Sequence, residues 1–194
     1  MTAQEYIVNW TRRGEQVSPI PLYKLLSLNL QPATISYLEV GLPNDAAPYI
    51  SFVNDSDSLY EGIAKLEDIY DLDLEPGKYV VIGADGSGSP IAINVQNNDA
   101  IEWLDHEDCF ASIYCNKSLE CLLIFLIIYR DFVSDVIKNN GEDAFLNARF
   151  TDEQYDAMKQ RMFMIDPVAV QEKGFWKDEL TMLLANRDYY QANP

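Results

Sequence analysis

The pattern of apolar and polar positions along the chain predicts a helical start. Residues 2–5, Thr-Ala-Gln-Glu, have the spacing of a capping box, in which two side chains satisfy two free backbone N–H groups. Tyr6 and Trp10 follow, and their spacing places them on one helix face. We expect two more helices, at about residues 21–29 and 32–41, the second of which ends at a glycine.

The middle of the chain shows the two-residue period of β-strands. Ile91, Ile93 and Val95 point one way, and the residues between them point the other way. Residues 84–88 have the composition of a hairpin connection. Because the apolar runs follow one another through short turns, we expect an antiparallel or mixed sheet of about five to six strands. The expected strands are residues 49–53, 78–83, 89–95, 100–104 and 109–114.

The last third of the chain returns to a helical period. Ser118 is a candidate N-cap, and residues 119–129 are apolar on all sides, which is typical of a buried helix. That helix becomes amphipathic and ends at residues 139–141, Asn-Asn-Gly, and Thr151 begins a second capping box. The expected packing residues of the last helices are Tyr155, Met158, Met162, Ile165, Trp176, Leu180, Leu183 and Leu184. We expect a frayed end over residues 187–194.

This order of elements, helices before and after a run of strands, predicts an α+β fold with helices against one face of the sheet. The chain has 194 residues, of which 48% are hydrophobic, and this is enough to bury a core without disulfides or metal. No repeat or long linker divides it, so we expect one domain over residues 1–194. Cys109, Cys115 and Cys121 lack metal-ligand spacing and are interpreted as buried thiols in a reducing compartment.

The charge balance narrows the function. The chain carries 31 acids and 14 bases, for a net charge of −17. Such a surface repels nucleic acids and anionic membranes and attracts basic proteins, although solubility alone explains it equally well. The first residues have no targeting pattern, and the longest apolar run, 119–129, is shorter than the ~20 residues of a membrane-spanning helix. We therefore expect a soluble, cytoplasmic protein that binds neither nucleic acid nor membrane.

Residue types that carry catalysis are scarce. His106 is the only histidine, and its polar neighbours are typical of a solvated loop. The glycines of residues 83–88 lead into a strand, so they predict a hairpin and not a phosphate site. Asp71, Asp73 and Glu75 alternate in a way that suits a hard cation, but the calcium-loop pattern is absent and a solvated acidic edge is favoured. We expect no catalytic residues, no metal and no cofactor.

The acids are gathered in two stretches. Residues 55–75 hold eight acids and one base, Lys65, and residues 99–108 hold five acids and no base. Both stretches flank expected strands. They form one negative face if they lie on the same side of the sheet, and an ordinary solvated surface is an equal explanation.

Several short motifs in order resemble the SUKH superfamily, which includes fungal regulators of cell-wall synthesis and many bacterial immunity proteins. The motifs are Gly41-Leu42-Pro43 after a helix, Phe52 at a strand end, Tyr79-Val80-Val81-Ile82-Gly83, the turn Asp85-Gly86-Ser87-Gly88, Pro90-Ile91-Ala92-Ile93-Asn94, a strand around Trp103, and Asn116-Lys117-Ser118-Leu119. The resemblance covers about residues 20–138 and leaves a C-terminal helical extension at about 142–188. It departs at Lys117, where a small polar residue is usual, and this bears little on the fold.

The resemblance implies a SUKH-like α+β domain with a binding surface in place of an active site. Bacterial members look like antidotes against polymorphic toxins, many of them nucleases, and an acidic antidote suits a basic nuclease. We therefore expect a non-enzymatic immunity protein that binds a basic toxin stoichiometrically through an acidic face. The expected contact residues are Asp55, Asp57, Asp71, Asp73, Asp99, Glu102, Asp105 and Glu107, with Tyr49, Tyr60, Tyr70 and Trp103 as aromatic anchors. Core packing is the stronger interpretation of Trp103.

Two other hypotheses remain open at this point. One is a regulatory scaffold that binds a cellular partner without any toxin, as the fungal relatives do, and the gene neighbourhood separates it from the antidote. The other is a small metal-dependent enzyme that uses Asp71, Asp73 and Glu75, and it requires binding of a divalent cation.

Overall fold

The protein, represented by a computed structural model that describes residues 1–71 and 75–192, is built on a seven-stranded sheet. The sheet contains β3 (Asp45–Ala46), β4 (Ile50–Phe52), β5 (Ala64–Lys65), β6 (Tyr79–Ala84), β7 (Pro90–Asn94), β8 (Ala100–Asp105) and β9 (Ala111–Asn116), while β1 (Val17–Ser18) and β2 (Leu42–Pro43) form a separate pair. The helices are α1 (Ala3–Thr11), α2 (Leu22–Leu25), α3 (Pro32–Val40), α4 (Leu66–Ile69), the short 3₁₀ helix η1 (His106–Asp108), α5 (Leu119–Asn140), α6 (Asp152–Ile165), α7 (Pro167–Gln171) and α8 (Phe175–Ala192).

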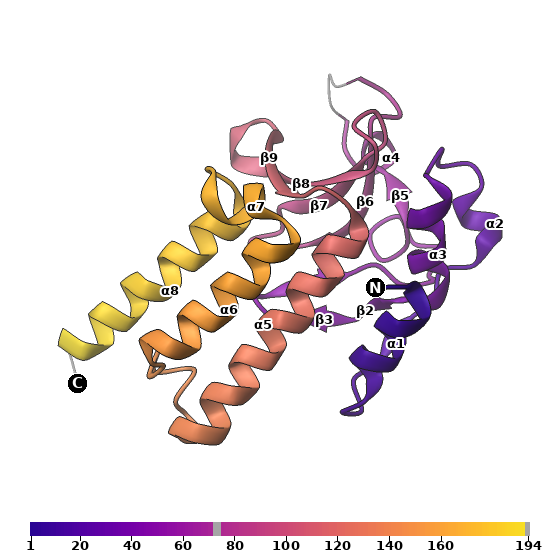
Figure 1. The fold of residues 1–194 in the computed structure, drawn as a ribbon. Helices are drawn as coiled ribbons and strands as arrows, with labels where there is room; N and C mark the ends of the chain where they lie inside the picture. The colour runs from indigo at the N-terminus through magenta and orange to yellow at the C-terminus, as the bar shows by residue number, and fades with distance from the viewer. Residues whose placement is uncertain (72–74, 193–194) are drawn as a thin grey trace.

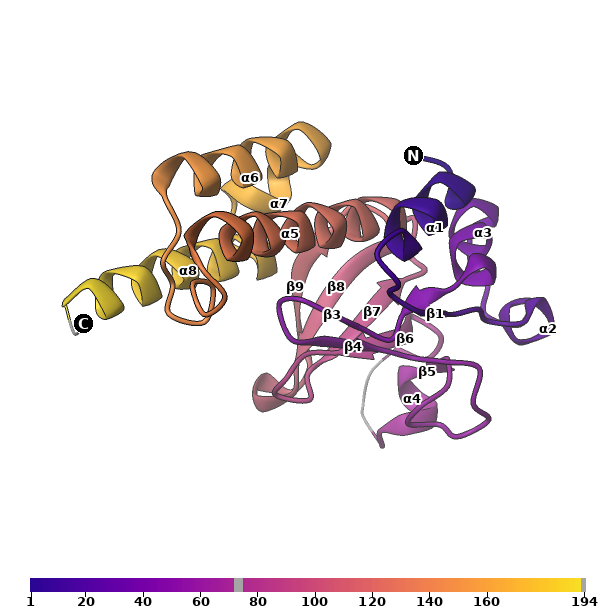
Figure 2. The same ribbon diagram turned by 90° about the horizontal axis from the view of Figure 1, so that it is seen from below.

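The long helix α5 crosses one face of the sheet. Helices α1 and α3 lie on one side of α5, and α6 and α8 lie on its other side (Figure 1). Helix α4 lies on the opposite side of the sheet from α5 (Figure 2). The fold is therefore α+β, as the sequence predicts.

The strand order of the sheet is β3-β4-β6-β7-β8-β9, and every pairing in it is antiparallel. Strand β5 also pairs with β6, beside Val80 and Val81, whereas β4 pairs with Gly83 and Ala84 further along the same strand. The sheet has seven strands where five to six are predicted. Strands β3 and β5 have only two residues each, too few to show a period in the sequence.

Local capping signals are confirmed where the sequence carries them. Both capping boxes form, at Thr2 before α1 and at Thr151 before α6. The Ser118 side chain accepts a hydrogen bond from the first turn of α5. Gly41 and Gly141 end α3 and α5 with φ angles of 113° and 112°, which a side chain would disfavour.

Both faces of the sheet are covered, which corrects the expectation of helices on one face only. All five residues of β7 are buried, including Ala92 and Asn94, which the alternating pattern assigns to the opposite face. A second, smaller apolar cluster forms there, where Leu66 of α4 packs with Tyr79, Val81, Ala92 and Leu104. Ala92 is therefore buried because α4 folds back over this side of the sheet, and Asn94 is buried with its side chain bonded to Glu102.

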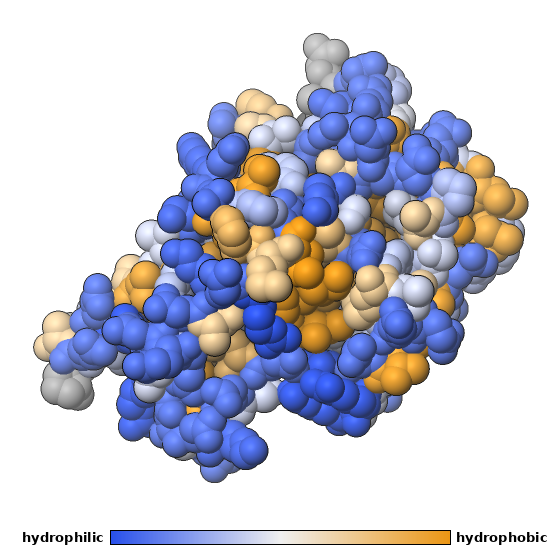
Figure 3. Space-filling model, in the orientation of Figure 1, coloured by the Kyte–Doolittle hydropathy of each residue, from blue (hydrophilic) through white to orange (hydrophobic). Residues whose placement is uncertain are grey.

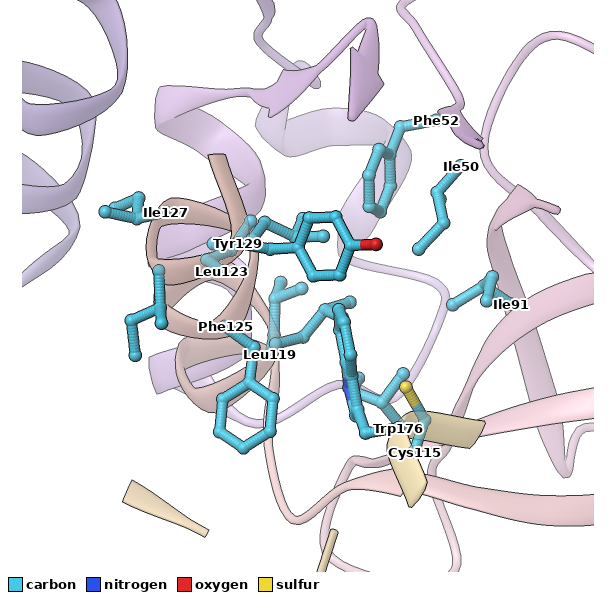
Figure 4. Close-up of a cluster of buried hydrophobic side chains, with 14 of the residues drawn as sticks. Ile50, Phe52, Ile91, Cys115, Leu119, Leu123, Phe125, Ile127, Tyr129 and Trp176 are labelled. Carbon is cyan, nitrogen blue, oxygen red and sulfur yellow. The ribbon is translucent and has the colours of Figure 1, made fainter. Parts of the chain in front are cut away.

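The main core lies between α5 and the sheet. Trp176 of α8 is fully buried and lies beside Cys115 of β9 and the side chains of α5 (Figure 4). Its ring centroid is 5.3 Å from that of Phe125, and its Nε1–H donates to Asn116 Oδ1 at 2.8 Å. Burying an aromatic side chain of this kind stabilises a fold by about 1.5–3 kcal/mol. Trp176 therefore ties α8 to both α5 and β9.

A buried carboxylate fixes the C-terminal helices to the edge of the sheet. Asp166, between α6 and α7, accepts from the Tyr114 hydroxyl and from the Lys117 backbone N–H, both at 2.9 Å. Gly174, before α8, lies against the same strand, and a Cβ there would be 2.7 Å from the Tyr114 carbonyl oxygen. Only glycine permits this approach, so the position of α8 against β9 is tightly determined.

Three expectations are wrong in detail. Helix α2 is much shorter than residues 21–29, and Asn29 has a φ of 55°, which is incompatible with a continuing helix. Helix α8 continues to Ala192 where fraying is expected, and Arg187 near its end pairs with Asp152 at 2.8 Å. Cys109 is exposed, whereas the other two thiols are buried as predicted. Among the residues described, no helix has the length and apolar character needed to cross a membrane.

Candidate partner-binding site

The two acidic stretches meet on the side of the sheet that faces away from α5. Tyr70, after α4, packs on Phe110, after η1, with ring centroids 4.8 Å apart. The contact brings together two short segments that carry acids on either side of Tyr70 and before Phe110, and we call this region the acidic face. It comprises Asp68, Asp71, Glu75, Asp105, Glu107 and Asp108, of which all but the half-buried Asp105 are exposed. The predicted contact residues Asp71, Asp105 and Glu107 belong to it.

Asp73 lies outside the described residues. Among those that are described, no group of three or more histidine, cysteine, aspartate or glutamate side chains is arranged to hold a metal. His106 is exposed on η1, and its Nδ1 lies 2.7 Å from the Ser89 hydroxyl.

Tyr60 and Tyr70 border one shallow hollow next to the acidic face, of about 240 Å³. The Tyr60 side chain is 80% exposed, whereas Tyr70 is half-buried against Phe110. Of the predicted anchors, these two therefore lie together.

Asp55 and Asp57 belong to an exposed loop that is clamped by a lysine. Lys24 Nζ donates to the carbonyl oxygens of Asp55 and Ser56 and pairs with the Asp57 carboxylate at 2.6 Å. The hydrogen bond from Lys24 lowers the pKa of Asp57. Asp57 thus has a partner within the chain, and the Asp55 side chain remains on the surface.

Asp99 and Glu102 have structural roles instead of the expected surface position. Asp99 is buried and accepts from the Gln31 backbone N–H at 2.7 Å, at the N-terminus of α3. A carboxylate there complements the helix dipole. Glu102 is buried and accepts from the Tyr79 hydroxyl and from Asn94 Nδ2, both at 2.8 Å. Burial prevents both side chains from touching a docked protein, so neither belongs to the acidic face.

A separate groove of about 920 Å³ lies between the sheet and α8, and we call it the sheet–α8 groove. The β3–β4 hairpin, the turn after β6, strand β8, α5 and α8 all line it. Its polar side includes four carboxyl groups, those of Asp45, Asp85, Asp178 and Glu179. Its apolar and aromatic side includes Tyr49, Trp103, Tyr129, Phe145, Leu146, Phe175 and Met182.

Two of the four carboxyl groups of the groove, those of Asp85 and Glu179, are held by neutral donors. The Tyr129 hydroxyl donates to Glu179 Oε1 at 2.6 Å, and Trp103 Nε1–H donates to Asp85 Oδ2 at 2.8 Å. Burial raises the pKa of Glu179 above its ordinary value. Burial acts in the same direction on Asp85, but hydrogen bonds from Ser87, Trp103 and the Ser89 backbone outweigh it, so the pKa of Asp85 is lowered. Among the described residues that line the groove, none is lysine, arginine or histidine.

Two of the predicted anchors, Tyr49 and Trp103, belong to the groove and not to the acidic face. Tyr49 is 79% exposed at the tip of the β3–β4 hairpin, with a φ of 59°. Trp103 is half-buried in the wall and bonded to Asp85, so it is neither a plain core residue nor a free anchor. The acids of the groove were missed by sequence reasoning, because Asp45, Asp85 and Glu179 are far apart in the chain.

Four of the six arginines gather around one carboxylate of α5, away from the groove. The Asp131 carboxylate of α5 lies within 3.5 Å of guanidinium nitrogens of four arginines, Arg12, Arg13, Arg130 and Arg161. Apolar side chains also gather over α5 between α1 and α6 (Figure 3). A hollow of about 410 Å³ lies there, bordered by Arg12 and Arg161 as well as Asp131. It therefore carries both signs of charge, whereas the charged residues that line the sheet–α8 groove are all acidic.

Comparison with known proteins identifies the family. A family model described as SUKH-4 immunity protein matches residues 23–184, which is most of the chain. The chain belongs to the SUKH-4 immunity protein family. No significant match was found among curated proteins or among solved structures.

The SUKH-4 match begins in α2 and runs into α8, so it includes the acidic face and nearly all of the sheet–α8 groove. It excludes α1, which supplies the backbone oxygens bound by Arg130. Membership of an immunity protein family implies a protein partner, and immunity proteins are generally not enzymes.

Proposed function

We propose that this SUKH-4 immunity protein neutralises a basic toxin in the cytoplasm by direct, stoichiometric binding through its acidic face. The observation that carries the proposal is the contact between Tyr70 and Phe110, which joins two acidic stretches into one surface. Residues 15–116 contain both acidic stretches but only three bases, Lys24, Lys65 and Lys78. Few positive charges therefore offset the acids in this part of the chain. The family favours this reading over a scaffold without a toxin.

The physical basis of the proposal is charge complementarity. A toxin that cleaves nucleic acid grips phosphates with lysines and arginines, and its cleft is therefore positive. An acidic protein approaches such a cleft rapidly, and rim charges mainly set the association rate and its dependence on salt. A bound acidic face also occupies the cleft in place of the nucleic acid. A nuclease is thus the toxin class that we propose.

Co-expression tests this function directly. The toxin-like gene next to this one is expressed in cells with and without the protein, and surviving colonies are counted. Rescue supports the antidote function and supplies a toxin for binding studies. No rescue, with both proteins present in soluble form, contradicts that pairing.

Matched charge reversals test the acidic face. The first variant carries Asp68→Lys, Asp71→Lys and Glu107→Lys, all at exposed positions of the face. The control carries the same change in net charge at exposed positions elsewhere, Asp143→Lys, Asp156→Lys and Glu172→Lys. We expect the first variant to associate with the toxin ~10-fold or more slowly and with a flatter salt dependence. Equal association rates for the two variants would show that the acidic face is not the contact surface.

A further inference from the structure

The sheet–α8 groove combines exposed apolar side chains with a partly buried carboxyl group. Its rim exposes apolar side chains, since Leu146 is 70% exposed and Met182 is 56% exposed. Its depth holds a carboxyl group, Glu179, whose pKa is raised by burial. A volume of about 920 Å³ lies at the upper end of the range of ~300–1,000 Å³ for binding pockets. The groove is therefore large enough for several side chains of a partner.

The lining of the groove selects the chemistry of an occupant. Four carboxyl groups without any lining base favour a cation over an anion or a neutral group. The apolar and aromatic walls favour a hydrocarbon stem below that cation. Lysine and arginine have this form, because their methylene stems pack on apolar surface and their charged ends remain near carboxylates or aromatic rings. A metal ion would need several converging carboxylates, and no such group is found among the described residues.

Hydrogen bonds link the wall of the groove to η1, beside the acidic face. Asp85, in the groove wall, accepts from the Ser89 backbone N–H at 3.0 Å. The Ser89 hydroxyl in turn lies 2.7 Å from Nδ1 of His106, the first residue of η1. Asp105 and Glu107 of the acidic face flank that histidine. A protein that covers η1 therefore lies close to Asp85, which lines the groove.

We propose that the sheet–α8 groove receives a lysine or arginine of the toxin, flanked by apolar residues that pack on Tyr49, Leu146 and Met182. The basic side chain enters toward Asp178 and Glu179, and its neighbours cover the rim. This inference rests on the proposed function and adds a second contact to it. The acidic face sets the rate of encounter, and the groove sets the lifetime of the complex, because desolvated contacts mainly slow dissociation.

A pair of methionine substitutions provides the test. Met182→Lys places a positive charge on the rim of the groove, and Met164→Lys places the same charge on α6, where the methionine is 73% exposed outside the groove. The probe is the toxin from which the wild-type protein protects cells in the co-expression experiment, purified in a catalytically inactive form. Affinity and dissociation rate are measured for both variants, and their thermal unfolding is compared with that of the wild type.

We expect Met182→Lys to weaken the complex ~10-fold or more, mainly through faster dissociation, and Met164→Lys to leave it within about twofold. Glu179→Gln retains an oxygen that can accept from Tyr129, and we expect it to weaken the complex as well. If the wild type rescues but Met182→Lys and Glu179→Gln bind as tightly as it does, the groove proposal is overturned and the antidote function stands. If the wild type protects cells from no toxin, the antidote function and the groove proposal are both overturned.

Discussion

Carboxylates serve opposite ends in two regions of this protein. Where α1, α5 and α6 meet, the Asp131 carboxylate lies within 3.5 Å of four arginines, and Arg130 also donates to the carbonyl oxygens of Trp10 and Asn9. In the sheet–α8 groove, four carboxyl groups line one space without any lining base. Both regions use carboxylates. Neighbouring arginines make the Asp131 carboxylate part of the packing between helices, whereas the groove carboxylates have no lining base and remain available to a cationic partner.

The difference teaches how to read a net charge of −17. An acid that is already paired adds little attraction for a partner, whereas unpaired acids around a concave surface focus the field there. The bases of this chain are concentrated in its helical part. The excess of negative charge therefore lies mainly in residues 15–116, which include the acidic face and part of the groove.

The largest effect is expected from removing the side chain that holds α8 in place. Trp176→Ala leaves a cavity and removes the indole N–H that donates to Asn116 Oδ1, and comparable substitutions cost about 3–5 kcal/mol of stability. Urea unfolding measures the change. A loss below about 1 kcal/mol would show that the groove wall does not depend on this anchor.

A smaller effect is expected at the arginine cluster. Asp131→Ala removes the carboxylate between four arginines, and we expect a loss of about 1–2 kcal/mol, because exposed pairs contribute 0.2–1 kcal/mol each. The loss should diminish in high salt, since the ion pairs are partly exposed. Toxin affinity should not change. A drop in affinity with an unchanged unfolding midpoint would place the contact surface at the arginine cluster and not at the acidic face.

A pH-dependent effect is expected at Glu179. Its pKa in the folded protein is raised above the ordinary value of 4.5, so the folded state is penalised as the pH rises through the raised value. Below pH 4.5 the penalty is absent. Glu179→Gln should therefore be more stable relative to the wild type at pH 7 than at pH 4. Unfolding midpoints of both proteins across this range provide the measurement, and a constant difference would contradict the assignment.

The smallest effect is expected at the loop clamped by Lys24. Lys24→Gln frees the exposed Asp57 carboxylate and keeps a hydrogen-bond donor for the loop carbonyls. We expect no measurable change in the unfolding midpoint, because exposed ion pairs contribute little. Association with a basic toxin should become slightly faster. Slower association would indicate that Lys24 itself contacts the toxin.

The parts of the fold that depend on neighbours in sequence were predictable. Caps at Thr2, Ser118 and Thr151 and the turn at Asp85 are determined within a few residues, and the sequence shows each of them. The burial of Ala92 was not predictable, because its cover comes from α4, more than twenty residues earlier. Alternation shows which residues share a face but not what lies above it.

The candidate site was predictable only in part. Both acidic stretches are visible in the sequence, but their junction depends on the Tyr70–Phe110 contact between distant segments. The groove depends on α8, whose place is determined by Asp166 and Gly174 at the edge of the sheet. Glu179 is partly buried, but nothing in the local sequence pattern around it distinguishes it from the exposed acids of helices.

The three tryptophans are distributed so that each reports on a different part of the molecule. Trp10 lies under the guanidinium of Arg130, Trp176 is fully buried in the core, and Trp103 is half-buried in the groove wall. A ligand in the groove should dehydrate the indole of Trp103 and shift its fluorescence emission to shorter wavelength. The emission of Trp10 and Trp176, which lie outside the groove, should not change. The protein thus carries a built-in optical probe of the groove, which needs no attached dye.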